Sequence, residues 1–372
     1  MQKSGALLSA VLIVIMATGV ARAQPVPFTS EAWTYSEGSS HRLENYLGEE
    51  TLYLENGTAT LMDAEFLNGI IEFDIATNGL RAFPGVRWRV QDPFNAEEFY
   101  IRPQQSGKAD AMQYTPVTNG LSAWQLYHGP IYSVPHDYKV DQWMHIKIVV
   151  KGDQADIYID SDEPILHVPK MKREAASGGF SIRAGLQPAR YANFSYMATD
   201  EVEIVGNADG IMPPALENRI ETWRISNFFD GAIMDGFYSL DEMELDDTDW
   251  REVPSEITGI TNLAPMADLG VENGNTLLVA VTVTVGQDAA RSIRFGYSDK
   301  VRLYLNDKLI YQGDNSYRSR DFRYLGTIGL FDELFLPLKE GDNEIVFAVT
   351  EAFGGFGIMA QIPNRENISI TP

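Results

Sequence analysis

The stretch WMHIKIVVKGDQADIYID, from Trp143 to Asp160, decides the fold. Apolar and polar residues alternate on both sides of Gly152-Asp153, and a period of two is typical of half-buried strands. A short glycine-containing turn between two such runs predicts an antiparallel β-hairpin. We therefore expect strands at Trp143–Lys151 and Gln154–Asp160.

The same alternation continues on both sides of this hairpin, while long helical periodicity is scarce. Further strands are predicted at Gly69–Thr77, Gly85–Val90, Glu98–Arg102, Gly178–Ala184 and Ala192–Met197. Gly, Pro and Asn separate these runs, as they do between the strands of antiparallel sheets. The pattern favours a sandwich or jelly roll over alternating strands and helices.

A second block of strands follows a stretch that contains Pro213-Pro214 and reads as a linker. Its strands are predicted at Ile220–Ile225, Thr276–Val285, Ser292–Tyr297, Lys300–Leu305, Leu309–Tyr311, Glu344–Thr350 and Gly357–Ile362. The predicted fold class is all-β, with two antiparallel β-sandwich (jelly-roll) domains in tandem after a signal peptide. The expected boundaries are 1–23 for the signal peptide, 24–205 for the first sandwich, 206–218 for the linker and 219–372 for the second.

The N-terminus has the pattern of a secretory signal peptide. Lys3 precedes a mostly apolar stretch, Ala6–Val20, and Ala21-Arg22-Ala23 places small residues at a cleavage site. The apolar stretch is shorter than the ~20 residues that a membrane span needs. We expect an exported protein, periplasmic or extracellular, without a membrane span.

Composition excludes several classes of function. The 372 residues include 52 acidic and 29 basic side chains and no cysteine, for a net charge of −23. Loss of Lys3 and Arg22 with the signal peptide would take the charge to −25. Disulfides, thiol nucleophiles and zinc-thiolate sites are excluded. So acidic a chain is not expected to bind nucleic acid, whose affinity for proteins depends on basic side chains.

Both blocks resemble known carbohydrate-associated folds. GIIEFDIA (Gly69–Ala76), the hairpin to Leu166 and GGFSIRAG (Gly178–Gly185) resemble the concanavalin A-like lectin/glucanase superfamily, in its laminin-G-like and keto-disaccharide-hydrolase-like branches. Gly296–Asp314 and Leu336–Glu351 resemble a galactose-binding-like jelly roll. The resemblance implies a carbohydrate partner, although such folds host many unrelated functions.

Glu72 and Asp74 form the first candidate catalytic pair. In Glu-x-Asp on a strand the two residues share a face about 6.6 Å apart, at ~3.3 Å per residue. Retaining glycosidases use two carboxyls about 5–5.5 Å apart. In laminarinase-type members of the superfamily the motif ends in a second Glu, where this chain has Thr77 or Asn78. The group that would protonate the leaving oxygen is therefore missing, and a polar strand face is the alternative interpretation.

The segment Trp88–Tyr127 is the richer candidate, because aromatic rings alternate there with amides and guanidinium groups. Aromatic faces cover the apolar side of a pyranose, and planar polar groups hydrogen-bond its hydroxyls. Within it, Pro103–Ala123 reads as a long polar loop, and long ordered loops often carry function. The predicted ligand-binding residues are Arg102, Gln113, Tyr114, Asn119 and Trp124. The alternative is that the tryptophans lie in the core and the amides secure the loop.

Other clusters are weaker. His128, His136 and His145 lack the spacing of a metal site, so no metal or cofactor is predicted. The acidic run Leu240–Trp250 leaves calcium as a candidate, although it lacks the regular spacing of an EF-hand loop. Arg318, Arg320 and Arg323 are expected to pair with Asp314 and Asp321 rather than bind a ligand.

The sequence thus favours an exported, lectin-like protein that binds carbohydrate without catalysis. Two alternatives remain. One is a glycoside hydrolase or related carbohydrate-active enzyme that uses Glu72 and Asp74. The other is a non-catalytic adhesion or scaffold protein with a protein partner. Two carboxyls converging in an aromatic groove would favour the enzyme, whereas an exposed apolar patch without a cleft would favour the scaffold.

Overall fold

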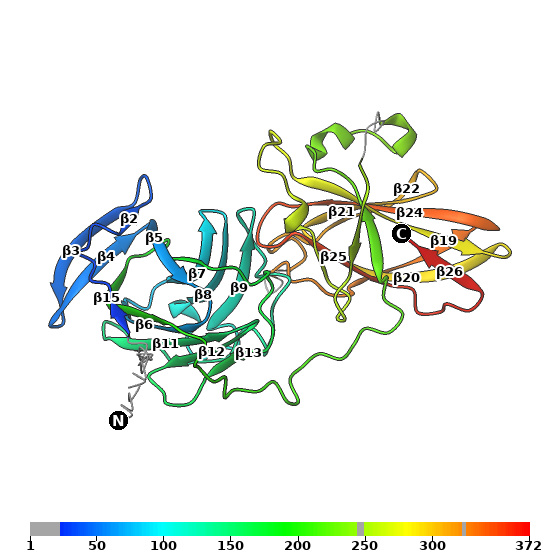
Figure 1. Cartoon of the computed structure of the whole chain (residues 1–372). Helices are drawn as coiled ribbons and strands as arrows, with labels where there is room; N and C mark the ends of the chain where they lie inside the picture. The colour runs from blue at the N-terminus through cyan, green and yellow to red at the C-terminus, as the bar shows by residue number, and fades with distance from the viewer. Residues whose placement is uncertain (1–22, 244–248, 322–324) are drawn as a thin grey trace, which may run out of the picture.

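The chain folds into four antiparallel sheets, in a computed structural model that describes residues 23–243, 249–321 and 325–372 (Figure 1). Over these ranges there is no α-helix, and only four short 3₁₀ helices interrupt the strands. The all-β class is therefore confirmed. The same ranges contain no helix long and apolar enough to cross a membrane. The predicted signal peptide lies, except for Ala23, outside the described residues.

Sheet A contains the hairpin that decides the fold. β11 (Met144–Lys151) pairs with β12 (Gln154–Ile159) from Ile146↔Ile159 to Lys151↔Gln154, and Gly152 in the turn has φ 62°. On its other side β11 pairs with β6 (Gly69–Thr77). The remaining strands of the sheet are β1 (Gln24–Pro25), β3 (Ser40–Tyr46), β4 (Glu49–Glu55), β13 (Leu166–Val168) and β15 (Ala189–Ala198).

Sheet B lies against sheet A to complete a sandwich. Its order is β10 (Leu121–Ser122), β9 (Met112–Thr118), β8 (Asn95–Ile101), β7 (Gly85–Asp92), β14 (Gly178–Ala184), β5 (Gly57–Phe66) and β2 (Thr34–Tyr35). Inward side chains of both sheets form one core cluster, in which Phe73, Trp88 and Phe180 are fully buried. A core continuous across two sheets defines the first unit.

The largest differences from the predicted strands of this unit lie in two segments. The segment Ser40–Phe66, for which no strand is predicted, forms β3, β4 and β5. The predicted loop Pro103–Ala123 also contains strand β9, which carries Pro116 in its sequence MQYTPVT. Both faces of β9 are buried, so the period-two alternation that marks a half-buried strand is absent.

The second unit is built from sheets C and D. Sheet D contains β16 (Thr222–Ile225), β17 (Arg251–Pro254), β19 (Thr276–Val285), β21 (Lys300–Leu305), β22 (Lys308–Asp314), β24 (Gly341–Thr350) and β26 (Ile368–Thr371). Sheet C contains β18 (Thr261–Asn262), β20 (Ala289–Ser298), β23 (Asp332–Leu338) and β25 (Gly357–Gln361). Asn306 and Asp307, the predicted turn, both have positive φ. A separate core cluster lies between these sheets.

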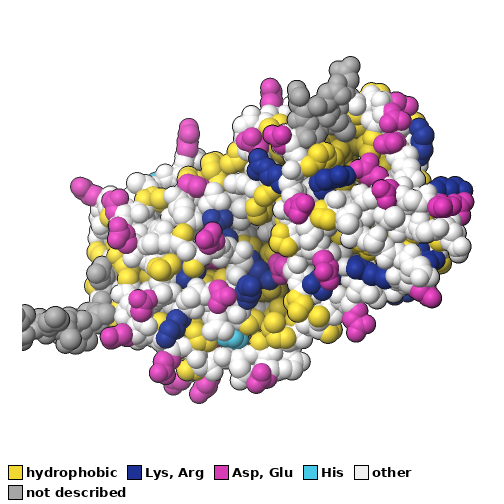
Figure 2. All heavy atoms as spheres, turned by 45° about the vertical axis from the view of Figure 1, so that its right-hand side comes forward, with side chains coloured by type: hydrophobic (Ala, Val, Ile, Leu, Met, Phe, Trp, Pro, Cys, Tyr) yellow, Lys and Arg dark blue, Asp and Glu magenta, His cyan; other side chains and the backbone are white. Residues whose placement is uncertain are grey.

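The two units contact one another through apolar side chains. Ile328 and Met359 of the second unit belong to the core cluster of the first. Leu126 of the first unit approaches Gly357 on β25 so closely that a Cβ there would lie 2.7 Å from its Cδ2. Figure 2 shows hydrophobic side chains, with Lys and Arg among them, along this junction.

Candidate functional site

The outer face of sheet B carries an unusual concentration of polar side chains. Alternation along β8 and the residue after it turns Glu98, Tyr100 and Arg102 outward, whereas Phe99 belongs to the core. The neighbouring strands add the side chains opposite them in register or next to them in space. We name this set the arginine face, and it comprises Arg87, Glu98, Tyr100, Arg102, Gln113 and Arg183.

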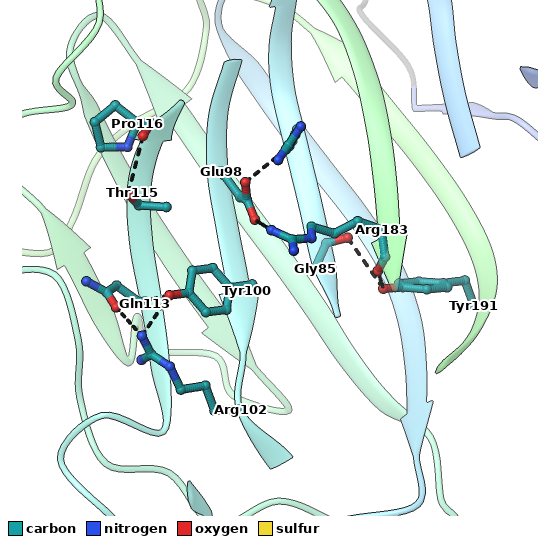
Figure 3. A network of polar contacts seen from close by, with 10 residues as sticks. Gly85, Glu98, Tyr100, Arg102, Gln113, Thr115, Pro116, Arg183 and Tyr191 are labelled. Atoms are coloured by element: carbon teal, nitrogen blue, oxygen red, sulfur yellow. Dashed lines mark hydrogen bonds and ion pairs between the residues drawn. The ribbon is translucent and has the colours of Figure 1, made fainter. Parts of the chain in front are cut away.

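Glu98 lies between two guanidinium groups. Arg87 Nε donates to Glu98 Oε2 at 2.8 Å. Arg183 donates to Glu98 Oε1 (Figure 3). The Glu98 side chain is fully buried, while those of Arg87 and Arg183 are 18% and 28% exposed. Burial alone would raise the pKa of Glu98, but the two guanidinium groups outweigh it and lower that pKa below its usual value. The carboxylate is therefore held ionised.

A second cluster adjoins it through the Tyr100 ring. Arg102 donates to the Tyr100 hydroxyl at 2.7 Å and to the side-chain oxygen of Gln113. The guanidinium carbons of Arg102 and Arg183 lie 4.8 Å and 6.0 Å from the Tyr100 ring centre. Burial raises the pKa of Tyr100 to about 12, so its hydroxyl stays protonated. The two clusters lie side by side on the same strands, and Tyr100, Arg102 and Gln113 are buried within them (Figure 3).

Gln113 also positions the segment that forms one edge of the face. Its amide nitrogen donates to the main-chain oxygens of Trp124 at 2.8 Å and Tyr127 at 2.6 Å. The Trp124 ring then lies 6.0 Å from the Arg102 guanidinium. Tyr317 and Phe353 of the second unit pack edge-on against Trp124, with ring centres 6.4 Å and 6.0 Å away. The second unit thus contributes aromatic rings beside the arginine face.

Of the five predicted ligand-binding residues, the structure brings Arg102, Gln113 and Trp124 together. Tyr114 lies on the other side of sheet B, in the core, where its hydroxyl donates to Glu97 at 2.6 Å. Burial raises the pKa of Glu97 to about 7. Tyr114 is therefore separated from the arginine face by the sheet.

Asn119 lies at the junction between the units. Its amide nitrogen donates to the main-chain oxygens of Ala264 at 3.1 Å and Ala267 at 2.9 Å. It also lines a cavity of about 650 Å³ whose other walls come from the second unit, including Phe228 and Met266. The amide nitrogen of Asn119 therefore bonds the second unit, and Asn119 is not part of the arginine face.

The predicted catalytic pair lies on the outer face of sheet A. His145 Nδ1 is 2.8 Å from Asp74 Oδ1, and Nε2 is 3.6 Å from Glu72 Oε1, so one imidazole bridges both carboxylates. Asn193 donates to the second oxygen of Asp74 at 2.7 Å. Burial opposes ionisation of Asp74, but the hydrogen bonds with His145 and Asn193 outweigh it and lower the pKa of Asp74. The contact with Asp74 in turn raises the pKa of His145. At neutral pH Asp74 is thus a base rather than a proton donor.

The remaining candidate clusters are engaged in contacts within the chain. Arg320 pairs with Asp332 and also contacts the Tyr297 hydroxyl, instead of the predicted Asp314. Arg318 stacks on Tyr317, while Arg323 lies outside the described residues. In the described part of the chain no group of three or more His, Asp or Glu side chains could hold a metal ion. The acidic run Leu240–Trp250 was the candidate calcium site, and its residues 244–248 lie outside the described ranges.

Sequence reasoning missed four members of the arginine face as binding residues: Arg87, Glu98, Tyr100 and Arg183. For Glu98 a signal was present, because alternation in EEFYIR places it on the same face as Tyr100 and Arg102. No local signal identifies Arg183, which lies 85 residues further along the chain. Only the pairing of β14 with β7 brings it to Glu98.

Comparison with known proteins gives likenesses of structure only. No protein-family model and no curated protein matches the chain. A carbohydrate-binding module, CBM66 from Bacillus subtilis, is 18% identical, with a TM-score of 0.34 over 45% of this chain and 96% of the module. The β-glucanase of Bacillus licheniformis is 14% identical, with a TM-score of 0.35 over 49% of this chain and 99% of the enzyme. A galectin-like protein of unknown function from Bacillus subtilis is 11% identical, with a TM-score of 0.36 over 47% and 94%.

Proposed function

We propose that this chain is an exported carbohydrate-binding protein that holds a glycan on the arginine face. The observation that carries the proposal is the Arg102–Tyr100–Gln113 cluster with Trp124 at its edge. Sugar sites combine fixed planar hydrogen-bonding groups, which orient the hydroxyls, with an aromatic ring that covers the apolar side of the pyranose. These side chains are positioned by neighbouring strands and by one another, which reduces the entropy lost on binding.

The electrostatics of the face favour binding over hydrolysis. General acid catalysis of glycoside cleavage requires a carboxyl that is protonated near neutral pH. Glu98 is held ionised by Arg87 and Arg183, and its two oxygens are occupied by them. The face therefore has a carboxylate suited to accepting a hydrogen bond or fixing the two arginines, and not to protonating a leaving oxygen.

The division into two domains is part of the proposal. We infer a linker at residues 206–218 and assign the second unit a supporting role, in which it places Tyr317 and Phe353 beside Trp124. Export to the periplasm or medium would bring the protein to polysaccharide ligands.

Isothermal titration of the full chain against a panel of oligosaccharides tests the proposal. We expect saturable binding to at least one member, weakened at least tenfold in Arg102→Ala, because loss of a charge-assisted hydrogen bond costs about 1.5–3 kcal/mol. Arg42→Ala, which removes a guanidinium from the outer face of sheet A, is the matched control and should bind as the parent does. Absence of binding at millimolar ligand, or equal loss in both variants, would overturn the proposal.

A further inference from the structure

The arginine face carries more positive than negative charge. Arg87, Arg102 and Arg183 contribute three guanidinium groups, and Glu98 is the carboxylate that contacts two of them. Asp110 is a further carboxylate whose charge reaches Tyr100. Even with Asp110 included, the guanidinium groups are in excess, although the whole chain carries a net charge of −23. The face is therefore a local exception in an acidic protein.

Several donors on this face remain free. Within the described residues, Arg87 uses only its Nε and Arg183 only one terminal nitrogen, both toward Glu98. A guanidinium has five N–H donors, so each arginine keeps terminal N–H groups without a protein partner. Side-chain exposures of 18% and 28% leave these groups accessible from outside.

Two partly buried guanidinium groups share one carboxylate, so the three groups together keep a net positive charge. Burying a charge without a counterion is costly, because the surrounding protein solvates it less well than water does. A second anion placed across the free nitrogens would remove that cost and gain charge-assisted, bidentate hydrogen bonds. A neutral sugar hydroxyl would satisfy the donors but leave the charge uncompensated.

We propose that the glycan bound by the arginine face is anionic, and that an oxyanion on the sugar binds to the terminal nitrogens of Arg87 and Arg183. The chemical class is an acidic oligosaccharide, whose oxyanion is either the carboxylate of a uronic acid or a sulfate ester. The buried Tyr100, Arg102 and Gln113 bond one another beside this site and hold the face in place. This inference rests on the proposed function, since it specifies the ligand of the same face.

Isothermal titration with three sets of oligosaccharides of equal length tests it: oligogalacturonate, sulfated galactan oligomers, and neutral cello-oligosaccharides. One acidic set should bind at least tenfold more tightly than the neutral set, and its affinity should fall as salt is raised from 50 to 500 mM, because salt screens the charges. Preference for carboxylate or for sulfate identifies the oxyanion.

Arg87→Gln is the informative variant, because among the described residues the Arg87 guanidinium contacts Glu98 alone, whereas that of Arg183 also lies 6.0 Å from the Tyr100 ring centre. It should lower affinity for the acidic set at least tenfold and change affinity for neutral sugars little. Arg190→Gln, on the outer face of sheet A, is the matched control, since Arg190 also pairs with a glutamate there. Thermal melts followed by circular dichroism establish whether both variants fold. If Arg87→Gln does not fold, Arg183→Lys is used in its place.

The outcomes separate the two proposals. Equal or tighter binding of neutral oligosaccharides would overturn the anionic ligand and leave the proposed function standing. The inference would also be overturned if an acidic set binds and neither Arg87→Gln nor Arg183→Lys changes its affinity. Absence of binding by all three sets would overturn both.

Discussion

The side-chain oxygen of Gln125 accepts a hydrogen bond from the Ser298 hydroxyl at 2.9 Å, although the two residues belong to different units. Both side chains are fully buried. The Gln125 amide nitrogen donates to the main-chain oxygen of Leu325, and its main chain bonds Gly354 and Ile328. Gln125 directly follows Trp124, so the residue that joins the units also positions the aromatic edge of the arginine face.

Gln125→Ala should therefore destabilise the protein by about 1–3 kcal/mol, because it leaves buried polar groups of the second unit unsatisfied. Urea denaturation followed by tryptophan fluorescence measures this change. Gln312→Ala, at an exposed position on β22, is the control and should lie within about 0.5 kcal/mol of the parent. Equal stability of the two variants would show that the Gln125 contacts do not couple the units.

Phe353→Ala should weaken glycan binding about three- to tenfold, because the ring packs against Trp124 at the edge of the arginine face and stays 58% exposed. Stability should change little, since little buried area is lost. Phe335→Ala is the control, because Phe335 is 75% exposed on β23 and has no contact with Trp124 among the ring pairs described. If both variants bind as the parent does, the second unit takes no part in the site.

His145 should titrate above its ordinary pKa of about 6.5, because Asp74 hydrogen-bonds the charged imidazole. The pair therefore contributes stability that is fully present below pH 6.5 and is lost as the pH rises through the folded-state pKa. Asp74→Asn should return the histidine toward 6.5, as measured by NMR titration of its ring protons. The same variant should leave glycan affinity unchanged. A fall in affinity would instead assign the ligand to sheet A and revive the hydrolase alternative.

Glu351 should make the protein less stable as the pH rises. Burial, with the nearby charge of Asp299, raises the pKa of Glu351 to about 9, and one of its oxygens has no partner among the described residues. Its unfolded-state value is near 4.5, so the folded state binds the extra proton, and stability falls between about pH 4.5 and 9.

Glu351→Gln removes this proton uptake. The free energy of unfolding should rise by up to about 3 kcal/mol at pH 7, at ~1.4 kcal/mol per pH unit above 4.5, and should depend less on pH. Chemical denaturation at pH 5, 7 and 9 measures it, with the exposed Glu340→Gln as control. A pH dependence identical to that of the parent would mean that Glu351 is ionised in the folded protein.

Much of the strand pattern could be predicted from the sequence. The period-two runs at Gly69–Thr77 and Gly178–Ala184 coincide with β6 and β14, and Thr276–Val285 coincides with β19. This succeeds at β6 because its buried residues alternate along most of the strand, and at β19 because the run is almost entirely apolar. β9 was not predicted from the sequence, because it is buried on both faces and contains a proline.

Only part of the candidate site could be predicted from the sequence. Arg102, Gln113 and Trp124 lie within 23 residues of one another, and their residue types indicated sugar recognition. Tyr114 was chosen on the same grounds, but its neighbour Gln113 takes the outer face of β9 and leaves Tyr114 facing the core. A one-residue shift reverses the face of a strand residue, and composition alone does not reveal the register.

By itself the sequence determined that this protein is built from antiparallel strands, that it has no thiol chemistry and that its overall charge is strongly negative. The tertiary structure alone decided where the positive charge is concentrated. Strand pairing brings Arg183 to Glu98 and Arg87, and contact between the units brings Phe353 to Trp124. Alternation is a local property of the chain, whereas a binding face depends on which strands become neighbours, and the long-range pairing of the whole sheet determines that.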